Sequence, residues 1–204
     1  RAAARGPRRA ISGAAKSAPL FRPLSIENRR KTGYNKANHI LKGAELSMKD
    51  GFISVAAGTP RIRVADCRYN AEQIFTLMRE ADKLGVRVLC LPELCLTGYT
   101  CGDLFLQDTL LRGAEEGLST VLAATKHLDM LCALGLPVQC KTDNKLYNCA
   151  VIIHKGKIIG LIPKTYLPNY GEFYEQRWFA SGAEVEEDVT LCGQTVHLGR
   201  HSVF

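Results

Sequence analysis

An apolar run at residues 86–91, interrupted by Arg87 alone, constrains the fold of this chain more than any other feature of its sequence. The run contains Val88-Leu89-Cys90-Leu91 and shows no polar alternation, so it predicts a strand that is buried on both faces. An apolar helix face precedes it and carries Ile74, Leu77, Met78, Ala81 and Leu84. A buried strand that follows such a helix indicates an α/β fold, in which helices cover a sheet.

The rest of the sequence continues this alternation. Asn70 is expected to cap the first helix, and Gly85 is expected to end it. The other expected elements are a strand over 52–57, a helix over 108–126, a strand over 130–137, a hairpin of 147–154 and 158–162 around a turn at 155–157, and a strand region from residue 194. The whole pattern predicts an α/β layered fold.

Positive charge is concentrated in residues 1–47. This segment has 11 Lys and Arg residues against 2 acidic ones, whereas residues 48–204 have 16 basic and 18 acidic residues. Its composition cannot bury enough apolar surface to offset ordering entropy, so we expect a disordered tail ahead of a domain over 48–204. The tail could be a transit peptide, a nucleic-acid-binding arm or upstream sequence translated in frame. The abrupt start of folded character at Met48 favours upstream sequence, and the nearly neutral body argues against nucleic acid as a partner.

The eight cysteines of the chain predict a reducing environment. Several stand inside apolar runs, as free thiols do when they serve as small apolar side chains, so we expect a cytoplasmic protein. Their spacing shows no C-x-x-C pair, so no metal site is predicted. No apolar run approaches the roughly 20 residues that a membrane span needs, so no membrane association is expected.

Two charged residues directly follow expected strands. Glu93 comes after Leu91-Pro92, and Lys164 follows Pro163 at the end of the hairpin. Ligand sites of α/β sheets gather at the carboxyl ends of strands, where a carboxylate suits a general base. The loop over 163–175 combines one cation and two carboxylates with prolines and tyrosines, a composition typical of binding loops. A solvated carboxylate and a solvated lysine are the alternatives that position alone leaves open.

The strings around these residues resemble a known family. Leu91-Pro92-Glu93-Leu94 with Thr97-Gly98-Tyr99 resembles the first signature of the nitrilase, or carbon–nitrogen hydrolase, superfamily. Pro163-Lys164 with Leu167-Pro168 and Glu172-Phe173 resembles the second. The resemblance implies a four-layer αββα sandwich, incomplete in this chain. Residues 55–60 and 96–105 further resemble the glutaminase domain of glutamine-dependent NAD(+) synthetases.

The resemblance also implies roles for individual residues. Glu93 would act as the general base, Lys164 would stabilise the oxyanion, and Glu172 would be a supporting carboxylate that orients the lysine. The residues implied in binding the substrate are Tyr99, Tyr170 and Phe173. Packing of the loop is the alternative role for these aromatic side chains.

A nucleophilic cysteine in a Cys-Glu-Asp motif completes the family's mechanism, but this motif is absent from the 204 residues. Cys95, Cys101 and Cys192 do not follow strands as that nucleophile does. We therefore expect the nucleophile to lie beyond Phe204, and the 204 residues alone to be inactive.

The function implied by the resemblance is a glutamine-hydrolysing NAD(+) synthase, a carbon–nitrogen ligase in NAD biosynthesis. Its glutaminase would release ammonia from L-glutamine for the amidation of nicotinate adenine dinucleotide. No cofactor is expected in this domain, while ATP and Mg²⁺ are expected in a C-terminal synthetase domain. A homo-oligomer is implied as well. The alternatives are a stand-alone nitrilase-family amidase or carbamoylase and a catalytically dead fragment.

Overall fold

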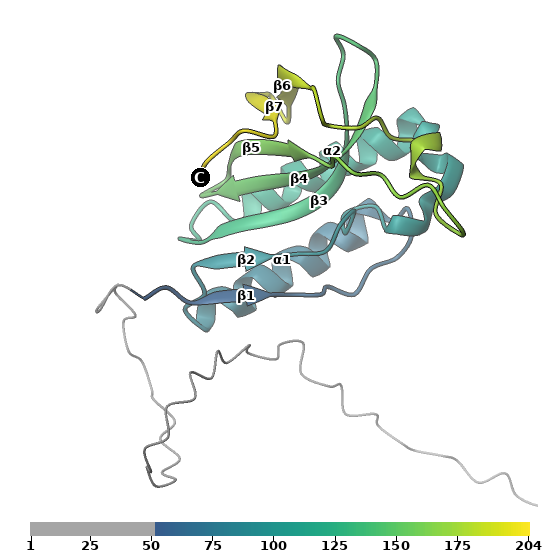
Figure 1. Cartoon of the computed structure of the whole chain (residues 1–204). Helices are drawn as coiled ribbons and strands as arrows, with labels where there is room; N and C mark the ends of the chain where they lie inside the picture. The colour runs from purple at the N-terminus through teal and green to yellow at the C-terminus, as the bar shows by residue number, and fades with distance from the viewer. Residues whose placement is uncertain (1–51) are drawn as a thin grey trace, which may run out of the picture.

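The computed structural model describes residues 52–204, which build a mixed sheet with two long helices on one of its faces (Figure 1). The strands are β1 (Val55–Ala57), β2 (Val88–Cys90), β3 (Leu131–Gln139), β4 (Leu146–His154), β5 (Lys157–Pro163), β6 (Glu186–Leu191) and β7 (Gln194–Gly199). The helices are α1 (Cys67–Lys83), α2 (Asp108–Ala124) and the 3₁₀ segments η2 (Tyr99–Leu106) and η3 (Glu175–Arg177). The predicted tail over residues 1–47 lies outside the described residues.

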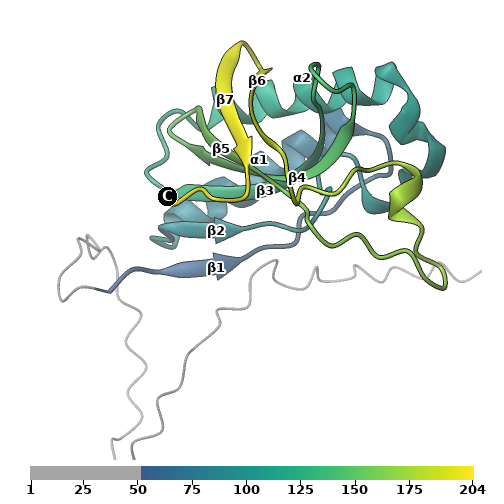
Figure 2. The ribbon, with the colours of Figure 1, turned by 45° about the horizontal axis from the view of Figure 1, so that its top comes forward.

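The strand order is β1-β2-β3-β4-β5-β7-β6. Strands β1, β2 and β3 are parallel, β4 and β5 continue as antiparallel neighbours, and β7 lies parallel to β5. Figure 2 shows that the sheet curls, so that the hairpin of β6 and β7 (yellow) stands at a steep angle to β1 and β2. Because β2 and β5 run in the same direction, their carboxyl ends lie at one edge of the sheet.

The first helix begins earlier than the sequence indicated. Asp66 is its N-cap and accepts a hydrogen bond from the backbone N–H three residues later. Asn70 is instead fully buried inside the helix, and its amide donates to the carbonyl oxygens of Arg63 and Leu96. The prediction of Asn70 as the cap is therefore wrong, because these long-range bonds occupy its side chain. Gly85 has a φ of +72° and follows the helix end, as predicted.

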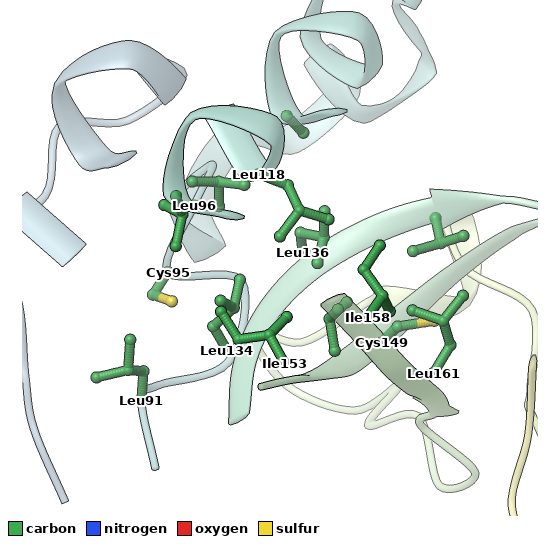
Figure 3. Packing of buried hydrophobic residues seen from close by; sticks show 14 of the residues in the cluster. Leu91, Cys95, Leu96, Leu118, Leu134, Leu136, Cys149, Ile153, Ile158 and Leu161 are labelled. Carbon is green, nitrogen blue, oxygen red and sulfur yellow. The ribbon is translucent and has the colours of Figure 1, made fainter. Parts of the chain in front are cut away.

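The hydrophobic core lies between the helices and the sheet. Leu118 of α2 lies close to Leu136 of β3, and Leu134 and Ile153 continue this layer along the strands (Figure 3). All four side chains are buried. The predicted hairpin is confirmed as β4 and β5, with Lys155 and Gly156 at positive φ in its turn. Strand β6 was not expected from the sequence.

The eight cysteines all lie within residues 52–204, and none of them forms a disulfide. Six are buried, Cys192 is half-buried and Cys90 is exposed. The same stretch holds no group of three or more His, Cys, Asp or Glu side chains arranged to bind a metal ion. No helix in this part of the chain is long and apolar enough to cross a membrane.

Candidate active site

Glu93 lies on a sharp turn that directly follows β2. Leu94, the next residue, has a φ of +49°. The turn lies against Gly135 of β3, where an added Cβ would come within 2.8 Å of the Glu93 carbonyl carbon and closer still to the backbone nitrogen of Leu94. The Leu96 N–H donates to the Gly135 carbonyl at 3.2 Å. Glycine at this point of β3 therefore lets the turn approach the strand and sets the position of Glu93.

Lys164 directly follows β5 and is held through its backbone from two sides. Its N–H donates to the carbonyl of Asn148 at 2.8 Å, and its own carbonyl accepts from Gly182 at 2.9 Å. Gly182 lies against Pro163, since an added Cβ would come within 2.6 Å of the proline ring. These contacts hold the backbone of Lys164 at the same edge of the sheet as Glu93.

The charged ends of these side chains meet. The Lys164 ammonium donates to Glu93 Oε1 at 2.7 Å and to both carboxylate oxygens of Glu175 at 2.9 Å. The side chain of Glu93 is 40% exposed, that of Lys164 is 28% exposed and that of Glu175 is only 2% exposed. Burial lowers the pKa of Lys164, but its hydrogen bonds to the two carboxylates outweigh burial and raise the pKa overall. The ammonium therefore remains charged at neutral pH.

The second carboxylate that contacts Lys164 is Glu175, whereas Glu172 had been predicted at this place. Glu172 is exposed, and among residues 52–204 the carboxylates bonded to Lys164 are Glu93 and Glu175. The loop turns back after Pro168, whose carbonyl accepts from the Glu175 N–H at 3.1 Å. Segment η3 begins at Glu175. This path directs Glu175 inward and leaves Glu172 at the surface.

The three predicted substrate-binding aromatic residues lie in a row beside the charged cluster. Phe173 is half-buried and meets Tyr99 and Tyr170 edge to face, with ring centroids 6.4 and 5.9 Å apart. The Tyr99 hydroxyl donates to Glu175 Oε1 at 2.6 Å. Burial raises the pKa of Tyr99, and the hydrogen bond to Glu175 raises it further, so the phenol keeps its proton and remains a donor. Tyr170 is exposed.

Asn148 is a site residue that the sequence reasoning missed. It is buried near the start of β4, and its side-chain amide donates to Glu93 Oε1. A polar residue inside the buried run of β4 was the available signal, because buried amides need hydrogen-bond partners.

A cavity of about 330 Å³ opens beside Glu93 and Lys164, on the sheet face away from the helices. Asn148 also lines it, and its remaining walls are apolar and include Cys90, Ala133 and Ile162. A larger hollow of about 830 Å³ lies between α1 and α2, but its lining includes neither the members of the charged cluster at Lys164 nor the three aromatic residues beside it. The smaller cavity is therefore the candidate substrate site, because Glu93 and Lys164 line it.

Of the three cysteines considered as nucleophiles, two are buried and Cys192 is half-buried. Cys95 and Cys101 are buried, and their thiols contact backbone carbonyl oxygens at 3.8 and 3.2 Å. Burial raises the pKa of Cys95 and of Cys192 to about 11, and it raises the pKa of Cys101 as well. These thiols remain protonated at neutral pH and are poor nucleophiles.

The structure places a lysine between two carboxylates at one edge of the sheet of an α/β fold, and comparison with known proteins identifies the family. The family described as carbon-nitrogen hydrolase matches residues 54–198. The chain belongs to this family.

The sequence relatives of the chain indicate which members of this family it resembles. A glutamine-dependent NAD(+) synthetase of Mycobacterium leprae is 40% identical over 136 residues, which cover 67% of this chain and 20% of that protein. The counterpart from Mycobacterium bovis is 34% identical over 154 residues, covering 76% of this chain and 22% of that protein. The chain thus spans about a fifth of the length of these curated relatives.

The fold of this chain is similar to those of solved structures. The glutamine-dependent NAD(+) synthetase of Cytophaga hutchinsonii superposes with a TM-score of 0.61 at 30% identity, covering 72% of this chain and 25% of that one. An amidase from Nesterenkonia sp. gives a TM-score of 0.55 at 19% identity, covering 71% of this chain and 54% of that one, a likeness of fold alone. The predicted nitrilase-type α/β fold is confirmed.

Proposed function

We propose that this chain forms part of the glutamine amidohydrolase half of a glutamine-dependent NAD(+) synthetase. The ammonia that it helps to release would amidate nicotinate adenine dinucleotide in a synthetase domain, which would also bind ATP and Mg²⁺. The observation that carries the proposal is the Lys164 ammonium held between Glu93 and Glu175 at the strand ends. The relatives support glutamine as the substrate, because those proteins are glutamine-dependent NAD(+) synthetases.

In the proposed reaction, a cysteine encoded beyond Phe204 supplies the nucleophile. Glu93 accepts the thiol proton, the sulfur attacks the carboxamide carbon, and the proton then leaves with ammonia. Water hydrolyses the resulting thioester to glutamate with the same carboxylate as base. Lys164 faces the carbonyl oxygen and stabilises the negative charge that develops on it.

Glu175 and the aromatic row have supporting roles in this proposal. Glu175 is buried and bonded to both Lys164 and Tyr99, so it orients the ammonium and takes no proton itself. Tyr170 and Phe173 stand beside the cluster and would contact the aliphatic part of glutamine. No cofactor takes part in these steps.

Ammonia release from glutamine by the protein extended beyond Phe204 tests the proposal. Glu93→Gln and Lys164→Ala should each lower kcat by about 10³-fold or more, because the members of such a site act as a unit. Glu175→Gln should also impair the reaction, whereas Glu172→Gln, which changes an exposed carboxylate of the same loop, is the matched control and should remain active. Full activity of Glu175→Gln together with loss in Glu172→Gln would overturn the assignment.

The amides that the extended protein hydrolyses discriminate between the proposed function and its two alternatives. Turnover of simple amides without turnover of glutamine would favour a stand-alone amidase or carbamoylase. Absence of ammonia release from any amide, in a folded extended protein, would favour a catalytically dead domain.

A further inference from the structure

A second ion pair joins the segments that carry Tyr99 and Glu175, outside the charged cluster. Arg177 donates from Nε and Nη2 to the two carboxylate oxygens of Asp103 at 2.7 and 2.9 Å. The indole of Trp178 donates to Asp103 Oδ1 at 2.9 Å. One carboxylate of η2 therefore accepts three hydrogen bonds from residues more than 70 positions later, and two of them come from one guanidinium in the paired geometry that fixes orientation most strongly.

Segment η2 contacts both ends of η3. At the first residue of η3, Glu175 accepts from Tyr99; at its last residue, Arg177 pairs with Asp103. A 3₁₀ segment of three residues has poor hydrogen-bond geometry of its own, so its position depends on outside contacts. Trp178 also packs against Phe105 of η2, with ring centroids 5.9 Å apart.

Stability alone does not account for this arrangement. The Asp103 and Arg177 side chains are 61% and 56% exposed, and ion pairs so exposed contribute little to the free energy of folding. Their paired geometry instead restricts how η3 can rotate. Rotation of η3 would carry the Glu175 carboxylate away from Lys164 and leave the ammonium paired with Glu93 alone.

We propose that Asp103, Arg177 and Trp178 form a latch that positions Glu175, and through it the ammonium of Lys164, for hydrolysis. This inference rests on the function proposed above. The three latch residues are positioning residues, because they lie outside the charged cluster and act through Glu175. An intact latch keeps the ammonium between the two carboxylates and leaves Glu93 able to accept a proton.

The first test needs only the 204-residue chain. Trp178 is the single tryptophan of the sequence, so emission excited at the indole band comes from this latch residue alone. Asp103→Ala should shift this emission to the red and raise its quenching by acrylamide, while the circular dichroism of the sheet and helices is retained. Unchanged emission would overturn the latch.

Asp129→Ala is the matched control for both tests. Asp129 is 58% exposed and pairs with Arg87, His154 and Lys155, so it resembles Asp103 in exposure and in being an ion-paired carboxylate. It lies two residues before β3, at the opposite end of the strands from the site. The emission of Trp178 and the catalytic activity should both be unaffected by this change.

The second test uses the extended protein. Asp103→Ala should lower kcat for glutamine by about tenfold to a hundredfold, the scale of a small misplacement of catalytic groups. Its KM should change by no more than about twofold, because transition-state positioning and not substrate binding is lost. Asp103→Asn retains one acceptor oxygen for the indole and should lose less than Asp103→Ala.

A double variant separates the latch from general structural damage. In a Glu175→Gln background, adding Asp103→Ala should cost less than about twofold further activity, because coupled residues are not additive. Fully additive losses, or a fully active Asp103→Ala enzyme, would overturn the latch. An inactive wild-type extended protein would instead refute the proposed function, and the tryptophan test would still decide whether the latch holds η3.

Discussion

Gly135→Ala is expected to displace the turn that carries Glu93. The added methyl group would lie 2.8 Å from both the carbonyl carbon of Glu93 and the carbonyl oxygen of Pro92, and closer still to the backbone nitrogen of Leu94. All three neighbours are backbone atoms, so no side-chain rotation can relieve the overlap. The turn itself must move away from β3.

The size of the effect follows from these contacts. Ordinary carbon contacts need about 3.5 Å, so relief of the tightest contact, with the backbone nitrogen of Leu94, requires the turn to withdraw by about 1 Å or slightly more. A misplacement near 1 Å can cost about 10²-fold in rate. Overpacking of this kind also destabilises a protein by about 1–3 kcal/mol. The variant should therefore fold less stably and hydrolyse glutamine about a hundredfold more slowly in the extended protein.

Urea denaturation of the 204-residue chain and ammonia release by the extended protein would measure the two effects. Gly113→Ala in α2 is the control, because its methyl group would meet the Cys67 side chain at 3.6 and 3.7 Å, which are ordinary contact distances. Alanine in a helix interior should instead stabilise the chain by about 0.5–1 kcal/mol. A Gly135→Ala protein with wild-type stability and activity would refute the argument that glycine sets the position of Glu93.

Three further predictions concern the same structure. Lys164→Met should lower the free energy of unfolding by about 2–4 kcal/mol, since Glu175 is left buried without its cation, and adding Glu175→Gln should recover at least half of this in urea denaturation. In the native 204-residue chain a disulfide reagent should modify Cys90 first, because it is exposed, whereas Cys149 should react only on unfolding, because burial raises its pKa; equal rates would refute this. Hydrogen bonds from the guanidinium of Arg177 and the indole of Trp178 lower the pKa of Asp103. The latch should therefore persist at about pH 4, where an ordinary aspartate titrates, and open only as the pH falls further. Tryptophan emission that shifts between about pH 6 and 4 would contradict this prediction.

The meeting of Glu93 and Lys164 could be predicted because it depends on strand direction. Both residues follow strands that the apolar runs identify, and β2 and β5 run in the same direction through β3 and β4. Residues that follow such strands must lie at one edge of the sheet, whatever the intervening loops do.

The carboxylate behind the lysine could not be predicted in the same way. Glu172 and Glu175 lie three residues apart in an irregular loop, where no periodicity tells which side chain points inward. The choice depends on the turn at Pro168 and on contacts with η2, which is distant in sequence. Strand β6 was missed for a related reason: it begins with Glu186, Glu187 and Asp188 and, among the strands of residues 52–204, pairs with β7 alone, as charged edge strands do.

Glu93 and Glu175 differ in burial, and this difference supports different roles for them in the proposed reaction. Glu175 is buried, and its oxygens accept hydrogen bonds from Lys164 and Tyr99, so taking a proton would break contacts that water cannot replace. Glu93 is bonded through Oε1 to Lys164 and Asn148, and within residues 52–204 no hydrogen bond reaches its Oε2. The bonded oxygen holds the carboxylate in place, while the other oxygen is available beside the cavity to accept the thiol proton. A base must be both oriented and accessible, and of these two carboxylates Glu93 meets both conditions.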